Sequence, residues 1–233
     1  MEKMKKQFPT FLPILWLVLA VILAASVAAG VWVWQAGGIR GGSEQKLLEG
    51  LKVYGAVPDF ELIERSGRKI GLKDLRGKVW ITQFFYTNCR DVCPLIVPQM
   101  GLLHLEYQSD PEFRLKVRFV SITADPERDT PEALRKFAER FSADRKLWLF
   151  LTGDKEKITR LAQEGFRVGI GEKENSSEVK KKTGEEKEIL HSSRLILVDR
   201  KGQIRGYYSG LDAEAMVRLR RDLKTLLRSR DTA

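Results

Sequence analysis

The two cysteines of this 233-residue chain lie four positions apart, in Cys89-Arg90-Asp91-Val92-Cys93, directly before Pro94. A disulfide that closes so small a loop would remove only about 2 kcal/mol of unfolded-chain entropy, against nearly 5 for a loop of about 100 residues. A disulfide that serves only to stabilise the fold would therefore be expected to close a longer loop. Proline is favoured at the first position of a helix, which puts Cys93 at a helix N-terminus, where the dipole favours a thiolate. The pair is therefore predicted to do redox chemistry, metal chemistry or both.

The two histidines decide which metal such a pair suits. Zinc usually takes four Cys or His ligands, whereas two thiolates with one imidazole suit copper, which accepts fewer ligands as Cu(I). His104 falls in the middle of a helical stretch, where a packing or solvent-facing role is expected. His191 follows a long polar stretch and precedes a strand, so a loop there can bring its ring over a neighbouring site.

Elements that alternate between strand-like and helix-like patterns must position these residues. Residues 79–86 form a continuous apolar run that is rich in β-formers, as expected of a strand buried on both faces. Proline after Asp129-Thr130 marks a helix start with a capping side chain, and Asp212 is expected to cap the last helix. Strands are predicted at residues 60–64, 69–71, 79–86, 115–123, 147–151, 195–198 and 205–209, and helices at 94–108, 131–141, 155–166 and after Asp212.

This order favours an α/β protein with a three-layer α/β/α sandwich. A cysteine pair between the first central strand and a helix makes the pattern thioredoxin-like. We expect this domain to span residues 57–233, with a polar insert at residues 172–188 that forms a hairpin or a mobile loop. Asp125 and Asp129 are explained by a turn and a helix cap, and Asp91 either tunes the cysteine site or is a solvated turn residue.

Residues 11–34 contain no charged side chain, and as a helix they would measure about 36 Å, enough to cross a membrane. Three lysines precede this stretch and a single arginine follows closely, so residues 1–10 are predicted to be cytoplasmic and the rest extracytoplasmic. Alanines around Ser26 resemble a signal-peptidase site, but the apolar stretch continues past them. We therefore expect a single-pass anchor in a bacterial inner membrane, with residues 35–56 as a linker and short helix.

The net charge of +10 comes from 41 basic and 31 acidic side chains that alternate along most of the chain. No basic run is interleaved with aromatic residues, so no nucleic-acid partner is expected. The composition also excludes collagen-like, disordered and disulfide-dense proteins. Residues 1–34 hold three of the bases and one of the acids, which leaves +8 on the remainder. Such a surface favours anionic lipid headgroups or an acidic partner.

Three blocks of sequence resemble the Sco/SenC family of membrane-anchored copper proteins, which assist the assembly of cytochrome c oxidase. The first block is Gly77-Lys78-Val79 with FFYTNCRDVCP at residues 84–94. The others are SITADPERDTPEALRKF at residues 121–137 and HSSRLILVDRKGQIRGYY at residues 191–208. They occur in the order and spacing of the family, from about Pro58 to the final helix.

The resemblance implies that Cys89, Cys93 and His191 bind one copper ion, as Cu(I) or Cu(II). It implies a metallochaperone that delivers the ion to the dinuclear copper centre of the oxidase, or that reduces the cysteines of that centre so that it can be loaded, as a thiol–disulfide reductase would. The partners it implies are the copper-bearing subunit of the oxidase, other copper carriers or thiol reductants, and membrane lipid. Two positions depart from the family: Arg90 replaces a proline found in many relatives, and Leu190 replaces an aspartate found before the histidine in some. The first adds a positive charge beside the thiols, and the second removes a candidate fourth ligand.

Two other functions remain open on the residues alone. A membrane-anchored thiol–disulfide oxidoreductase without metal fits the location and the fold, but such enzymes usually carry CxxC and have no need of His191. A peroxidase is weaker, because only Thr87 and Cys89 resemble a peroxiredoxin site and the expected arginine and proline are missing. A purely structural module would leave the cysteine placement unexplained.

Overall fold

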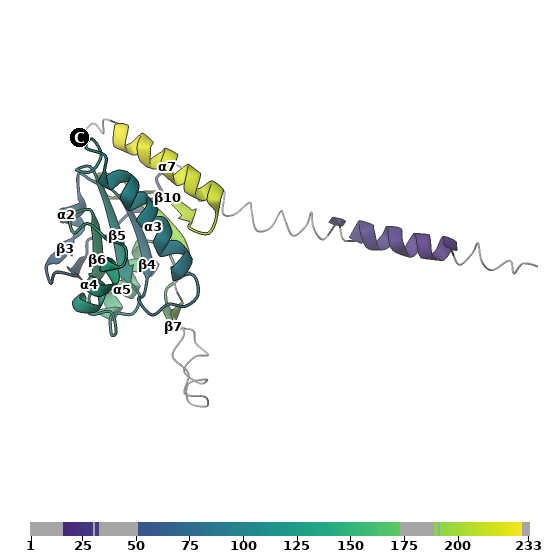
Figure 1. Cartoon of the computed structure of the whole chain (residues 1–233), viewed down its shortest axis with the longest axis horizontal. Helices are drawn as coiled ribbons and strands as arrows, with labels where there is room; N and C mark the ends of the chain where they lie inside the picture. The colour runs from purple at the N-terminus through teal and green to yellow at the C-terminus, as the bar shows by residue number, and fades with distance from the viewer. Residues whose placement is uncertain (1–15, 30, 33–50, 173–188, 191, 230–233) are drawn as a thin grey trace, which may run out of the picture. The chain divides into compact units, whose positions relative to one another are not determined.

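The computed structural model describes residues 16–29, 31–32, 51–172, 189–190 and 192–229. It divides into two compact units, Met1–Leu47 and Leu48–Ala233. In the first unit, residues 16–29 and 31–32 are helical, drawn in purple in Figure 1. Among the residues described, no helix is both long and apolar enough to cross a membrane. The predicted anchor also includes residues 11–15, 30, 33 and 34, which lie outside the described part, so the anchor stays a prediction.

The second unit, here called the sheet unit, is built on one eight-stranded sheet with the order β1-β10-β9-β4-β5-β6-β2-β3. The central strands β4, β5 and β6 are parallel, and β9 runs antiparallel to β4. All seven residues of β4 are buried, which confirms the prediction from its continuous apolar sequence. The strands are Gly55–Ala56 (β1), Glu61–Glu64 (β2), Lys69–Gly71 (β3), Val79–Phe85 (β4), Val117–Thr123 (β5), Trp148–Thr152 (β6), Arg194–Val198 (β9) and Gln203–Ser209 (β10).

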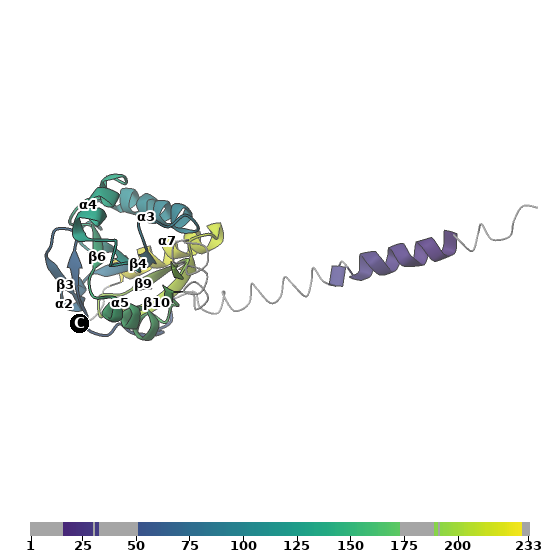
Figure 2. The same ribbon diagram turned by 90° about the horizontal axis from the view of Figure 1, so that it is seen from below.

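Helices cover both faces of this sheet, as Figure 2 shows. One core lies between the sheet and α3, α4 and α7, and it includes both cysteines. The other core lies under α2, α5 and the turn that follows α5. The helices are Leu72–Leu75 (α2), Cys93–Gln108 (α3), Pro131–Glu139 (α4), Lys155–Arg160 (α5) and Ala213–Arg228 (α7). The predicted three-layer α/β/α arrangement is therefore present.

Both cores consist of residues from Leu51 onward. A hydrophobic core that is complete within one stretch of chain is what a domain needs to fold by itself. The sheet unit is therefore self-contained and can be studied without the first 47 residues.

The helix predicted at residues 155–166 differs from expectation in its second half. After α5 the chain forms a π-helix at Leu161–Gly165, closed by a 2.9 Å hydrogen bond from the amide of Phe166 to the carbonyl of Leu161. The wider turn brings Gly165 against Pro58, so closely that a β-carbon would lie 2.9 Å from Pro58 Cδ. Packing against a residue about 100 positions earlier, which periodicity does not report, therefore sets this turn.

The insert predicted at residues 172–188 is flanked by a short strand pair. Gly171–Glu172 (β7) pairs antiparallel with Ile189–Leu190 (β8) as a separate two-stranded sheet. Residues 173–188 lie outside the described residues, so the prediction for them stays untested.

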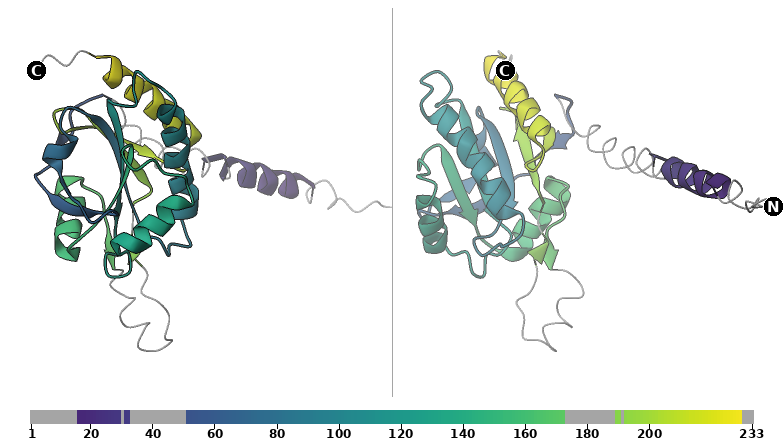
Figure 3. Two further views of the ribbon diagram at one scale, coloured as in Figure 1. Left: turned by 60° about the vertical axis from the view of Figure 1, so that its left-hand side comes forward. Right: turned by 45° about the vertical axis from the view of Figure 1, so that its right-hand side comes forward.

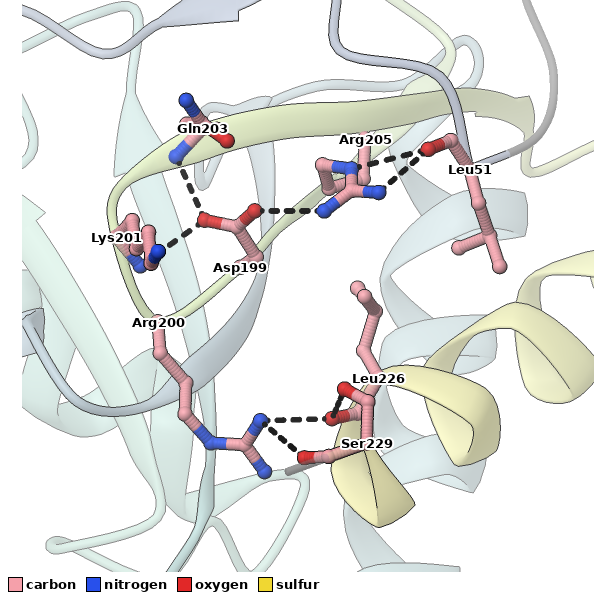
Figure 4. A network of polar contacts seen from close by, with 8 residues as sticks. All are labelled: Leu51, Asp199, Arg200, Lys201, Gln203, Arg205, Leu226 and Ser229. Carbon is pink, nitrogen blue, oxygen red and sulfur yellow. Dashed lines mark hydrogen bonds and ion pairs between the residues drawn. The ribbon is translucent and has the colours of Figure 1, made fainter. Parts of the chain in front are cut away.

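At the edge where β4 begins, polar contacts fix the entry of the chain into the sheet unit (Figure 4). Arg205 donates from Nε and Nη2 to the carbonyl of Leu51, at 3.1 and 2.6 Å, and from Nη1 to Asp199 at 2.9 Å. Arg200 donates to the carbonyls of Leu226, Leu227 and Ser229, which are orphan acceptors at the C-terminal end of α7. The chain therefore enters at the sheet edge opposite to the end of β4.

His104 packs in the core, in agreement with its predicted role. It lies on α3, fully buried, with its ring 5.4 Å from that of Trp148. Its Nε2 accepts a 3.1 Å hydrogen bond from the amide of Asp144. Burial lowers the pKa of His104, and Arg65 and Arg114 lower it further, while Asp144 acts in the opposite direction.

This lowered pKa predicts a loss of stability in mild acid. In the unfolded chain His104 binds its proton below about pH 6.5, whereas the folded protein resists that proton. Stability is therefore complete above that pH and is expected to fall as the pH drops from 6.5 toward 5, by at most about 1.4 kcal/mol per pH unit. Urea unfolding of the sheet unit across this range measures the slope. His104→Gln should flatten it and His191→Gln, the matched control, should not; equal slopes in parent and His104→Gln would contradict the prediction.

Candidate metal and redox site

The cysteine loop joins the carboxyl end of β4 to the start of α3. Cys93 is the first residue of α3 and Pro94 the second, so the helix begins one residue earlier than predicted. The carbonyl of Val92 accepts from the amides of Leu95 and Ile96, at 2.9 and 3.0 Å, which closes the first turn. This places Cys93 at a helix N-terminus, as the sequence predicts.

The two cysteines are reduced and buried side by side. Their residues are 9% (Cys89) and 6% (Cys93) exposed, and no disulfide joins them. The amide of Cys93 lies 3.4 Å from Cys89 Sγ, to which it donates, and the two side chains are hydrogen bonded to each other. The amide of Cys89 donates to the carbonyl of Tyr86 at 3.3 Å, which keeps the loop compact. One turn of separation thus brings the sulfurs together, where they can form a disulfide or bind one ion.

The predicted preference for a thiolate at Cys93 was wrong for the pair of thiols. Burial raises the pKa of the Cys93 thiol, and the hydrogen bond with Cys89 raises it further. A backbone hydrogen bond from Tyr86 lowers this pKa but does not compensate. Desolvation of a charged sulfur thus outweighs the helix dipole, and the side chain of Arg90, exposed to solvent, does not reverse this. A metal ion that binds here must displace a proton.

Asp129 is not the cap of α4, which corrects the role expected from the sequence. The cap is Thr130, whose hydroxyl accepts from the amide of Ala133 at 3.3 Å. The buried Asp129 carboxylate instead accepts from the amide of Thr87 at 3.1 Å and from the hydroxyls of Thr87 and Thr123. Burial raises the pKa of Asp129, although the hydrogen bonds from Thr123 and Thr87 act to lower it. Asp129 therefore ties the cysteine loop to the end of the neighbouring strand β5.

Asp125 has the turn role that the sequence predicts. Its carbonyl accepts from the amides of Arg128 and Asp129, at 3.2 and 2.9 Å, and its carboxylate pairs with Arg128 at 3.2 Å. Asp91, between the cysteines, is exposed, in agreement with a solvated turn residue.

His191 lies outside the described residues, so its distance from the sulfurs is not part of the structure. The backbone that follows it is described: the carbonyl of Ser193 accepts from the amide of Gly210 at 3.0 Å. Gly210 packs on the first turn of α3, where a β-carbon would lie 2.9 Å from Ile96 Cγ2. Since β9 is antiparallel to β4, β9 also starts at the edge where β4 ends.

Among the described residues, no three His, Cys, Asp or Glu side chains gather as a metal site. The site therefore consists of the buried dithiol, the Asp129 network behind it, and the chain that arrives at β9. Sequence reasoning missed Thr87 and Thr123 as partners of Asp129. The only available signal was that Thr87 directly follows one predicted strand and Thr123 is the last residue of another, and that both strands end at the same edge.

Comparisons with known proteins identify the family of this chain. A family model described as SCO1/SenC matches residues 52–228. The SCO1 protein homolog of Bacillus subtilis is 30% identical over 157 residues, which is 67% of this chain and 75% of that protein. BsSco, whose solved structure identified a disulfide switch in a member of the Sco family of cytochrome c oxidase assembly proteins, is 26% identical. Its TM-score is 0.63, with 76% of this chain and 96% of that chain covered.

A further solved structure is that of ScoI from Bradyrhizobium japonicum with copper bound. It is 26% identical, with a TM-score of 0.54, and the match covers 72% of this chain and 99% of that one. These neighbours share with the sheet unit a thioredoxin-like fold of mixed sheet and helices. The family model covers more than half of the sequence, including both cysteines and His191. This chain therefore belongs to the SCO1/SenC family.

Proposed function

We propose that this protein binds one copper ion through Cys89, Cys93 and His191 and serves in the assembly of the copper centre of cytochrome c oxidase. The observation that carries the proposal is the reduced dithiol, buried at the end of β4 with its sulfurs in hydrogen-bonding contact. The solved relative with copper bound, and the relative assigned to oxidase assembly, support it.

The donor set fits copper better than other common metals. Two thiolates are soft ligands and select Cu(I), Zn or iron–sulfur clusters, and one imidazole adds a ligand that copper accepts. A structural zinc site needs four ligands, and the only other histidine, His104, is committed to the core. Both cysteines belong to a hydrophobic core cluster, so water is largely excluded from their inner side. The chain would hold copper as cargo, with disulfide formation as the switch that prevents binding.

The predicted anchor gives the proposed function its location in the cell. A helix at residues 11–34 would hold the protein in a bacterial inner membrane with residues 1–10 in the cytoplasm and the sheet unit outside, next to membrane lipid. There the proposed partners are the copper-bearing subunit of the oxidase and other copper carriers or thiol reductants. Ligand exchange between the dithiol and thiolates of the subunit transfers the ion without a change in its charge.

A copper titration of the reduced sheet unit tests the ligand set. We expect one copper per chain, and His191→Ala should lose the Cu(II) absorption of the parent and bind Cu(II) more than about 100-fold more weakly, because a ligand matters more than its supporting groups. His104→Ala is unsuitable as a control since it opens the core, so His104→Gln serves instead. A His191→Ala variant with the parent's affinity and spectrum would refute the ligand assignment.

The alternative is a thiol–disulfide oxidoreductase without metal, which the reduced and mutually hydrogen-bonded thiols favour. In that reaction the dithiol gives two electrons and two protons to a partner disulfide through a mixed disulfide, and becomes a disulfide itself. Disulfide reductase turnover that does not depend on His191 and is suppressed by copper would support this function over the first.

A further inference from the structure

Helix α3 has no polar outer face. Of its sixteen residues only Glu106 is charged, in a chain with 31% charged residues. The side of α3 that points away from the sheet carries Leu95, Leu102 and Leu105, whose exposed fractions are 58, 53 and 54%, together with exposed Pro98. Spacings of three, four and three residues place these four on one face of a helix. We call them the α3 stripe: Leu95, Pro98, Leu102 and Leu105.

The neighbouring helices on the same face of the sheet, α4 and α7, differ from α3 in having a charged outer side. α4 and α7 bury an apolar side and present charged side chains to solvent, among them Arg135 and Lys136 on α4. Isolated exposed leucines are normal on protein surfaces, but a contiguous exposed apolar patch marks an interaction site. The α3 stripe is therefore expected to be a binding surface for a partner.

The stripe begins at the dithiol. Leu95 is two residues after Cys93 in the first turn of α3, and from there the stripe extends about 15 Å along the helix. Because both cysteines are almost completely buried, a molecule that exchanges an ion or electrons with them must cover the surface next to this first turn. The apolar stripe is part of that surface.

A row of positive charge borders the stripe on α7, which lies beside α3 (Figure 3). We call it the basic border: Arg220, Arg221, Lys224 and Arg228. Glu106 of α3 joins the two helices, with ion pairs to Arg220 at 3.1 Å and to Lys224 at 3.4 Å. The one acid of α3 is thus neutralised, and Arg221 is paired with the buried Asp222 at 2.9 Å. Two acids therefore face four bases, and the combined surface is apolar with a net positive edge.

We propose that the α3 stripe and the basic border form the docking surface for the protein that exchanges copper or electrons with the dithiol, and that the matching surface of that protein is apolar with an acidic rim. This inference rests on the proposed function and names the chemistry of its partner. Charge complementarity favours such a surface and speeds association.

The test is a binding titration of the copper-free, reduced sheet unit with the copper-site domain of the oxidase subunit, also copper-free and reduced. Leu102→Lys and Leu105→Lys should each weaken binding by about tenfold or more, as loss of a central apolar contact does. The matched control is Leu115→Lys, which changes an equally apolar residue, 70% exposed, that is not part of the stripe. It should bind like the parent. Lys224→Gln should slow association, and binding should weaken as salt is added.

Three other outcomes would each contradict the proposed docking surface. Equal affinity of parent, Leu102→Lys and Leu105→Lys would show that the partner binds elsewhere. A sheet unit that sediments as a dimer and becomes a monomer in these variants would assign the stripe to self-association. Binding to anionic phospholipid vesicles that is lost in the variants, with unchanged partner affinity, would assign it to lipid. Since the titration uses no copper, failure of the parent to bind copper would refute the proposed function and leave this test intact.

Discussion

Replacement of Cys93 with serine is expected to abolish one-to-one copper binding by the sheet unit, with a loss of affinity of more than about 100-fold. The substitution removes one sulfur atom and keeps the size of the side chain. A serine hydroxyl stays protonated at neutral pH and is a hard oxygen donor, whereas copper of either charge favours the soft thiolate. Cys89→Ser should have the same effect, because each thiol supplies half of the pair. Competition with a chromophoric chelator measures the affinity, and metal analysis gives the stoichiometry.

The fold should tolerate both serine variants, so the comparison is clean. Each cysteine lies at the rim of a core cluster and not at its centre, and the amide of Cys93 can donate to a serine oxygen at position 89 as it does to the sulfur. Unfolding in urea provides the control for folding. A folded Cys93→Ser or Cys89→Ser protein that still binds one copper with the parent's affinity would exclude the dithiol as the metal site, and the oxidoreductase function would then be the better one.

Most of the sheet could be predicted because its signals are local. The continuous apolar run at β4 reports burial on both faces, whatever lies next to it. Thr130-Pro131 and Asp212 mark the starts of α4 and α7 through hydrogen bonds within the same few residues. The cysteine pair was found for the same reason, since both sulfurs belong to one turn and the helix that follows is set by Pro94.

The features that could not be predicted from the sequence depend on contacts between residues that are distant in the chain. Asp129 was assigned to a cap because the sequence shows only its neighbours, while its partners Thr87 and Thr123 come from the ends of two other segments. The pKa of Cys93 is raised mainly by burial in a core cluster. That cluster includes residues of α4 and α7, which are distant from Cys93 in the sequence. Exposure of the α3 stripe was equally hidden, because four apolar residues at helical spacing predict a buried face.

These long-range contacts hold the start of the cysteine loop in place. The cysteine loop begins at Tyr86, and Thr87 is held through both its amide and its hydroxyl by a carboxylate that belongs to another segment. In the proposed function the dithiol alternates between a disulfide, two thiols and a bound ion, which changes the distance between the sulfurs, so the backbone that carries them must be held in place. Asp129 supplies that support through the amide and the hydroxyl of Thr87.

Asp129→Ala is therefore expected to destabilise the sheet unit by about 2–4 kcal/mol, because it leaves the amide and part-buried hydroxyl of Thr87 and the buried hydroxyl of Thr123 without their acceptor. Thr130→Ala, the matched control on the adjacent residue, should cost only about 1 kcal/mol, the usual effect of losing a helix cap. Urea unfolding measures both. The loosened loop should also let a thiol reagent react faster with the cysteines of folded Asp129→Ala, while Thr130→Ala reacts like the parent.

Asp129→Asn refines this test, since the amide keeps one oxygen acceptor and should fall between the parent and Asp129→Ala in both measurements. If Asp129→Ala lost no more stability than Thr130→Ala, and its cysteines reacted no faster, the carboxylate would not hold the loop. Asp129 would then be a buried residue of the turn before α4, and the support of the dithiol would have to come from α3 alone.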